Sequence, residues 1–232
     1  MTAASPTDAD PDAPTALLVY AHPEPTSFAA ALREQAERTL GSRGWRVEVS
    51  DLYADGFDPV AGPGDFTAPA DPSRLHVQRE QAHAAATGSL APDVEREVER
   101  LERADLVVFL APLWWFGLPA ILKGWVDRVF VYGRVYGNGL TFETGPLRGK
   151  QAMLALTTGG PEAAYSEGGR HGDLDVLLHS VHHGMFRFTG MEALEPFVAW
   201  GAGWADDATR ADYLRAFGER LAEVASERAE AA

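Results

Sequence analysis

The sequence predicts an α/β protein built on a parallel, doubly wound sheet. Short and nearly continuous apolar runs recur along the chain, as expected of strands buried on both faces. Stretches with apolar residues at helical spacing alternate with these runs, which is the pattern of βαβ units. Stretches rich in glycine and proline follow several of the runs, where connecting loops are expected.

The first part of the chain contains two predicted strands with a helix between them. Residues 15–21 form an apolar run, and residues 46–50 alternate in polarity, as a strand near the edge of a sheet does. Between them, apolar residues recur at helical spacing from Phe28 to Leu40, and Gly41 ends the element.

A long stretch rich in Pro, Gly, Asp and Ala follows over residues 53–91. Only residues 78–86 within it suit a helix. Because loops of this length are usually functional or disordered, we expect one or the other here.

The remainder of the chain continues the alternation of helices and strands. The apolar spacing predicts helices over 92–105, 118–129, 173–183 and 214–224, and strands over 106–112, 151–158 and 192–200. Pro119 stands in the first turn of its helix, where proline is tolerated.

Composition excludes several classes of function. The chain has 232 residues, which suits one large domain, and its formal net charge is −14. Such an acidic protein is a poor partner for nucleic acid or for an anionic membrane surface. The absence of cysteine excludes disulfides and thiolate redox chemistry, so any electron transfer needs a bound cofactor.

The two ends and the longest apolar run point to a cytoplasmic protein without membrane insertion. Residues 1–14 lack the basic and apolar regions of a signal peptide and are expected to form a flexible tail. The run over 106–122 is shorter than the ~20 residues of a membrane helix and contains prolines. We expect a single domain over 15–224 and a frayed terminus over 225–232.

The loop after the first strand has two hydroxyl side chains directly before a helix. Thr26 and Ser27 can cap that helix or bind an anion at its N-terminus. Neither a Walker motif nor a GxGxxG motif occurs there, which disfavours a nucleoside triphosphatase and the dinucleotide-binding fold.

The loops after the third and fourth strands carry the other candidate residues. The segment Pro112–Phe116 offers aromatic walls and backbone amides, which suit a planar heteroaromatic ligand, although the rings could equally fill the core or an interface. Gly159 and Gly160 permit close approach of a ligand, and Tyr165 and His171 can donate protons or hydrogen bonds. Three such loops at one edge of the sheet indicate a single shared ligand.

Two other sites can be considered. His179, His182 and His183 have helical spacing, but no acidic partner accompanies them, so no metal site is predicted. Ser166 lacks the first glycine of a nucleophile elbow, which disfavours a serine hydrolase.

The motifs "AHPEPTSF", "PLWWFGLPAILKGWVDRVF", "GPLRGKQAMLALTTGG" and "YSEGGRHGD" resemble those of the NAD(P)H:quinone oxidoreductases, a family of flavodoxin-like flavoproteins. The resemblance extends over nearly the whole chain. It implies a flavodoxin-like doubly wound sheet of five parallel strands, in the order 2-1-3-4-5, with helices on both faces. It also implies a cytoplasmic homodimer with the active site at the interface, a tightly held FAD with FMN as the alternative, and NAD(P)H as co-substrate.

The resemblance also assigns roles to individual residues. Tyr165 and His171 would be catalytic and lie near the pyrimidine edge of the flavin. Acceptor contacts would come from Trp115, Phe116, Gly159, Gly160, Tyr136, His171 and Phe188. Flavin contacts would come from His22, Thr26, Ser27, Phe28, Pro112, Leu113, Trp114, Trp115, Phe116, Thr157, Thr158, Gly159, Gly160, Tyr165, Arg210 and Leu214.

Three positions differ from the family pattern. His76 and Trp114 stand where the family often has glutamine, and Asn138 stands where it has a second tyrosine. The first difference leaves FAD and FMN both open, and the other two indicate an altered acceptor pocket. The implied activity is two-electron reduction of a quinone by NAD(P)H, through alternating hydride transfers at flavin N5. The alternatives are an ancillary flavoprotein of a potassium-efflux system and a biosynthetic or azo-type reductase.

Overall fold

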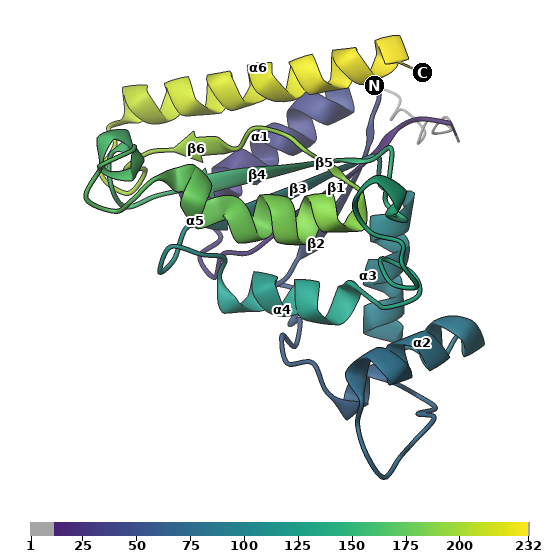
Figure 1. Cartoon of the computed structure of the whole chain (residues 1–232). Helices are drawn as coiled ribbons and strands as arrows, with labels where there is room; N and C mark the ends of the chain where they lie inside the picture. Colours follow the sequence, from purple (N-terminus) through teal and green to yellow (C-terminus); the bar gives the residue numbers. More distant parts are fainter. Residues whose placement is uncertain (1–11, 232) are drawn as a thin grey trace.

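A computed structural model describes residues 12–231, and across this range one parallel sheet contains six strands (Figure 1). The order is β2-β1-β3-β4-β5, with β6 also paired to β4, which confirms the predicted order 2-1-3-4-5. The predicted tail, 1–14, lies mostly outside the described residues. The strands are β1 (Thr15–Tyr20), β2 (Arg46–Asp51), β3 (Leu106–Pro112), β4 (Gln151–Thr157), β5 (Glu192–Ala193) and β6 (Phe197–Ala199).

Helices cover both faces of the sheet and bury its alternating side chains (Figure 1). Leu18 and its same-face neighbours pack under α1 and α6, whereas Leu17 and Val19 face the layer that includes α3, α4 and α5. None of the helices described is both long enough and apolar enough to cross a membrane. The α-helices are α1 (Phe28–Ser42), α2 (Val77–Thr87), α3 (Pro92–Arg103), α4 (Ala120–Val129), α5 (Leu174–Val181) and α6 (Asp207–Ala231).

The predicted fifth strand, 192–200, is divided into β5 and β6. Gln151 is paired with Glu192, but Ala155 is paired with Phe197, so the edge strand contains one extra residue. The extra residue lies in the segment 194–196, which contains a proline that cannot donate to the ladder. This bulge was not predicted, because the apolar residues before and after Glu195 and Pro196 were assigned to a single strand.

The long stretch over 53–91 is held against the domain by buried polar contacts. Arg128 of α4 donates from Nε to Asp65 at 2.8 Å and pairs through Nη1 with Asp93 at 2.9 Å. Within the stretch, the buried Glu80 carboxylate accepts from the backbone amides of residues 70 and 71. These contacts tie the stretch to the domain, and its one predicted helix corresponds to α2.

The last two helices differ in length from the sequence prediction. Helix α5 is followed by a π-helical turn, His182–Phe186, and a 3-10 turn, Arg187–Thr189. Helix α6 continues through residues that we expected to fray. Arg228 donates to the Asp105 carboxylate at 2.5 Å and to the Gly149 carbonyl at 3.0 Å, which ties this end of the helix to the domain.

Candidate functional site

The loops after β1, β3 and β4 surround two adjoining cavities at the carboxyl edge of the sheet. We call them the ring cavity, about 850 Å³, and the helix cavity, about 590 Å³, which opens at the start of α1. Both volumes are typical of ligand sites. The ring cavity is lined by His22, Pro112, Leu113, Trp114, Trp115, Phe116, Thr157, Thr158, Gly159, Gly160, Tyr165 and His171. The helix cavity is lined by His22, Glu24, Thr26, Ser27, Phe28, Ala29, Ala31, Thr157, Thr158, Ala202, Gly203, Arg210 and Leu214.

The two cavities share three lining residues, so they adjoin and form one continuous site. His22 comes from the first loop, and Thr157 and Thr158 come from the end of β4. A ligand that fills both cavities would need a flat aromatic part and a polar, extended part. The arrangement follows from the topology, because the carboxyl ends of neighbouring parallel strands meet at the same edge.

The first loop presents hydrogen-bond donors at the N-terminus of α1. Ser27 is the N-cap, and its Oγ accepts from the amide of Ala30 at 3.1 Å. The amide and hydroxyl of Thr26 both donate to the Glu24 carboxylate, at 2.9 and 2.7 Å. These hydrogen bonds lower the pKa of Glu24 below its ordinary value. An anion bound to Thr26 would have to replace this carboxylate.

The second loop is a tight turn that carries three aromatic rings. Trp114 and Gly117 exchange backbone hydrogen bonds of 3.1 and 3.0 Å. The two residues between them, Trp115 and Phe116, have φ values of 50° and 61°, in the left-handed region. A non-glycine residue there costs roughly 1–2 kcal/mol, and such strain is common at functional sites. The strained turn leaves the Trp115 side chain 97% exposed.

The third loop brings the two candidate catalytic side chains together. The rings of Tyr165 and His171 lie 5.0 Å apart between centroids, and Tyr165 is also 5.4 Å from the ring of Trp200. A Cβ on Gly160 would lie 3.2 Å from the Tyr165 ring and 3.4 Å from the His171 ring. Glycine at this position therefore allows both rings to pack against the backbone beside the cavity.

The charges around the two cavities are few. Among the residues that the structure describes, no Asp, Glu, Lys or Arg lines the ring cavity, and only Glu24 and Arg210 of these types line the helix cavity. Arg210 donates from Nε and Nη2 to the carbonyl of Ala202, at 3.3 and 3.2 Å, which fixes its position beside the cavity. The ring cavity therefore suits an uncharged aromatic system, and a phosphate group would find its donors in the helix cavity.

The structure brings together most of the residues that the sequence assigned to one ligand. All those assigned to the flavin line one or both cavities. Two residues assigned to the acceptor, Tyr136 and Phe188, line neither cavity. Their rings lie 5.8 Å apart in a separate aromatic cluster with Tyr132 and Phe142.

Sequence reasoning did not identify Glu24 and Trp200 as part of the site. Glu24 lies inside the quoted motif "AHPEPTSF", so its carboxylate could have been recognised as a competitor for the hydroxyl donors beside it. Trp200 follows β6, and no local pattern indicates that its ring meets Tyr165.

Comparison with known proteins identifies the family. A family profile described as "Flavodoxin-like fold" matches residues 14–221. NAD(P)H dehydrogenase (quinone) 1 of Cavia porcellus is 41% identical, over 90% of this chain and 76% of its own length. Ribosyldihydronicotinamide dehydrogenase (quinone) of Homo sapiens is 38% identical, over 88% of this chain and 89% of its own length.

A solved structure agrees with these relatives. A Klebsiella pneumoniae protein, proposed to be a quinone reductase, superposes with a TM-score of 0.84 at 37% identity, and the match covers 90% of this chain and 84% of that one. This chain belongs to the NAD(P)H:quinone oxidoreductase family. It is therefore an oxidoreductase with the flavodoxin-like fold that the quoted motifs predicted.

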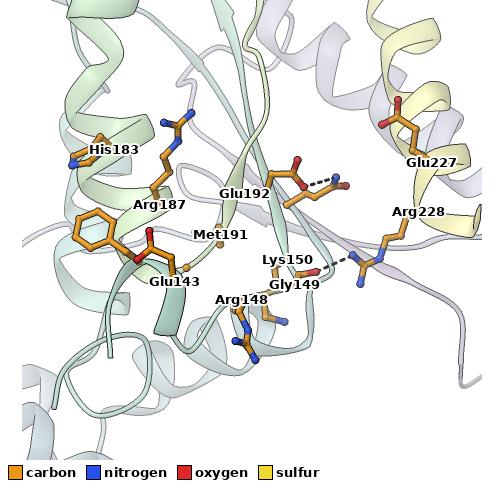
Figure 2. Close-up of a pocket in the computed structure, with 13 residues that line it drawn as sticks. Glu143, Arg148, Gly149, Lys150, His183, Arg187, Met191, Glu192, Glu227 and Arg228 are labelled. Carbon is orange, nitrogen blue, oxygen red and sulfur yellow. Dashed lines mark hydrogen bonds between the residues drawn. The ribbon is translucent and has the colours of Figure 1, made fainter. Parts of the chain in front are cut away.

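A third cavity, of about 610 Å³, lies at the amino end of the sheet and includes the first residues of β4 and β5 in its lining (Figure 2). Two of the basic side chains that line this cavity already have hydrogen-bond partners. Arg228 donates to the Asp105 carboxylate, and Lys150 Nζ donates to the carbonyls of Glu102 and Ala104. Figure 2 shows Arg148 and Arg187 pointing in opposite directions, so these two side chains do not converge on one ligand. The cavity contains no residue predicted for the site.

The histidines of α5 and the following π turn do not form a metal centre in the described structure. His179 and His183 stack with centroids 5.0 Å apart, but His182 packs near Phe186 instead. Within residues 12–231, no three side chains of the types His, Cys, Asp and Glu are grouped so as to hold a metal ion.

Proposed function

We propose that this protein is a flavin-dependent NAD(P)H:quinone reductase in which one flavin nucleotide occupies both cavities. The observation that carries the proposal is the continuity of the two cavities through His22, Thr157 and Thr158. The uncharged, aromatic ring cavity fits the isoalloxazine, and the helix cavity fits the chain and phosphates. We favour FAD over FMN because the helix cavity extends to Arg210 and Leu214, beyond the start of α1.

The donors in the helix cavity fit a phosphorylated ligand. The N-terminus of α1 offers backbone amides and its dipole to an anion. Arg210 supplies a positive charge, and the Glu24 carboxylate would turn away from Thr26 when a phosphate takes its place. Because Glu24 is exposed, that movement needs no change in the core.

When bound, the flavin supplies hydride transfer from NAD(P)H to the acceptor through N5, in two alternating half-reactions. Tyr165 and His171 would donate hydrogen bonds, or a proton, at the N1/O2 edge of the ring, where negative charge develops. A proton donor in position typically contributes about 10²–10⁴-fold to the rate. Their packing against Gly160 holds both rings beside the cavity, which supports this role.

The second loop would hold the flat substrates. Trp115 and Phe116 present their rings at the mouth of the ring cavity, where nicotinamide and quinone would bind in turn. Aromatic walls of this kind would hold the reacting atoms at a separation of ~3–3.5 Å. Stacking on these rings would allow one site to accept nicotinamide and quinone in turn, since both are flat, conjugated rings.

We further propose a cytoplasmic homodimer with the active site at its interface. The exposed Trp115 ring supports this arrangement, and so do the clustered rings of Tyr136 and Phe188, which the single chain buries only in part. Leu140, in the loop beside that cluster, is also 47% exposed. Light scattering of the purified protein should give twice the mass of the chain, and a monomer that retains full activity would contradict the proposal.

The function is tested by two half-reactions observed separately. NADH and NADPH are each mixed with the flavin-loaded protein in a stopped-flow instrument, and loss of the yellow colour is followed. Menadione is then added without oxygen. The proposal predicts rapid bleaching followed by return of the colour. A flavin that NAD(P)H does not bleach, or that menadione does not reoxidise, would exclude a quinone reductase.

A further inference from the structure

Trp114 has a different ring neighbour from Phe116, which lies in the same loop. Its ring lies 6.0 Å from the ring of His22 in the first loop, whereas the ring of Phe116 lies 5.6 Å from His171 in the third loop. The turn therefore spans the ring cavity. Because His22 lines both cavities, Trp114 lies at the junction between them.

The backbone of Trp114 is fixed where it stands. Both its amide and its carbonyl are hydrogen-bonded to Gly117, at 3.1 and 3.0 Å. The amide of Leu113, directly before it, donates to the carbonyl of Thr157 at 2.8 Å. The indole is 42% exposed, so it is packed on one side and open on the other. A half-exposed ring on a fixed backbone is available to contact a ligand with little loss of entropy.

His22 is oriented by a hydrogen bond of its own. Its Nδ1 accepts from the amide of Glu24 at 3.0 Å, so the proton of the neutral imidazole is assigned to Nε2. Neither His22 Nε2 nor Trp114 Nε1 has a hydrogen-bond partner within residues 12–231. The junction thus offers two ring N–H donors and an indole face. The ring cavity beside it is lined by no Lys or Arg among the described residues.

We propose that Trp114 closes against His22 over the sugar-alcohol chain that joins the flavin ring to its phosphate. Trp114 is then a positioning residue that sets how tightly the cofactor is retained, and not a wall of the isoalloxazine. The hydroxyl groups of the chain would accept from the two ring N–H groups, and the indole face would cover its carbon atoms. This inference rests on the proposed function, because it assumes that a flavin occupies both cavities.

The test compares two ligands and three variants. FAD carries the sugar-alcohol chain, and lumiflavin is the same ring without it. Apoprotein is titrated with each ligand, and binding is read from the change in flavin fluorescence. The variants are Trp114→Gln, Trp114→Phe and the matched control Trp204→Gln, since Trp204 is 88% exposed and lines neither cavity. The thermal midpoint of each apoprotein verifies that it is folded.

We expect Trp114→Gln to weaken FAD binding about tenfold, as the loss of one aromatic contact implies. Lumiflavin binding should change less than about twofold. Trp114→Phe should recover part of the FAD affinity because it restores a ring without the donor. Trp204→Gln should bind both ligands as the wild type does.

Two results would overturn the inference while leaving the proposed function intact. If Trp114→Gln retains wild-type affinity for FAD, the indole does not hold the chain. If FAD and lumiflavin lose affinity equally, Trp114 contacts the ring and not the chain. If wild-type protein binds neither ligand, the proposed function itself fails, and this inference is overturned with it.

Discussion

Trp114 and Gly117 exchange two backbone hydrogen bonds, of 3.1 and 3.0 Å, and so close a two-residue turn around Trp115 and Phe116. Both central residues have positive φ values, as in a type I′ turn, where asparagine and glycine are preferred. Two bulky aromatic residues at these positions therefore destabilise the folded state. The turn is held in place by β3 and α4 on either side of it, and it displays the rings at the mouth of the ring cavity.

Phe116→Gly should therefore stabilise the fold and weaken the function. Glycine relieves the left-handed φ of 61°, and the Phe116 side chain is 43% exposed, so little buried area is lost. We expect the free energy of unfolding to rise by about 1 kcal/mol and quinone reduction to fall. Urea unfolding and steady-state turnover with menadione measure the two effects. A less stable variant would show that the turn is not strained.

The double variant Tyr165→Phe, His171→Gln should slow flavin reduction more than it weakens NAD(P)H binding. The two rings, 5.0 Å apart, are the proton donors available beside Gly160 in the third loop. We expect the stopped-flow rate of reduction to fall by about 10²-fold or more, with little change in the Kd of the nicotinamide. An unchanged reduction rate would remove the catalytic role of both residues.

Glu97→Ala should destabilise the protein strongly. The buried carboxylate accepts from Ser50 Oγ at 2.6 Å, Trp125 Nε1 at 2.9 Å and Arg100 Nη1 at 2.9 Å, which joins β2, α3 and α4. Its removal leaves buried donors unpaired, at a cost of about 3 kcal/mol. Glu99→Ala, at an exposed position of the same helix, is the matched control. Equal unfolding free energies in the two variants would refute the role of this network.

His182 should make the protein less stable in mild acid. Burial lowers the pKa of His182, and its Nε2 is buried without a hydrogen-bond partner among residues 12–231. The unfolded chain therefore binds a proton at His182 more readily than the folded chain does. The contribution of the neutral imidazole to stability is complete above the unfolded pKa of about 6.5, and it is lost as pH falls through the lower pKa of the folded state.

The variant His182→Gln tests this pH dependence. Its unfolding free energy should decline less than that of the wild type between pH about 7.5 and about 5.0, because no buried imidazole has to be charged. His179→Gln, at an exposed position three residues earlier, should decline as the wild type does. Parallel pH profiles for wild type and His182→Gln would contradict the assignment.

The elements and the placement of the three loops could be predicted from the sequence pattern, whereas the order of the strands was implied by the resemblance to the family. Buried strands such as β3 consist of continuous apolar residues, and helix α1 shows its buried face as a repeated spacing with Ser27 as its cap. These signals are local. They identify the elements, and the topology of parallel sheets then brings the loop ends together.

The remaining features depend on contacts that no local pattern encodes. The left-handed conformation of Trp115 and Phe116 contradicts the preference of both residues, so only the tertiary structure could reveal it. The bulge between β5 and β6 lies at Glu195 and Pro196, between apolar residues that the sequence pattern assigned to one strand. The ring contact of Trp114 with His22 joins residues that are far apart in sequence, and it is the observation behind the different role that we propose for this indole.

The most direct test of the central claim is the visible absorption spectrum of the purified protein after incubation with FAD and removal of the excess. The account predicts a yellow protein with about one flavin per chain, which heat releases and chromatography identifies as FAD. A protein that stays colourless after incubation with FAD, and again with FMN, would contradict the account, because neither cavity would then hold a flavin.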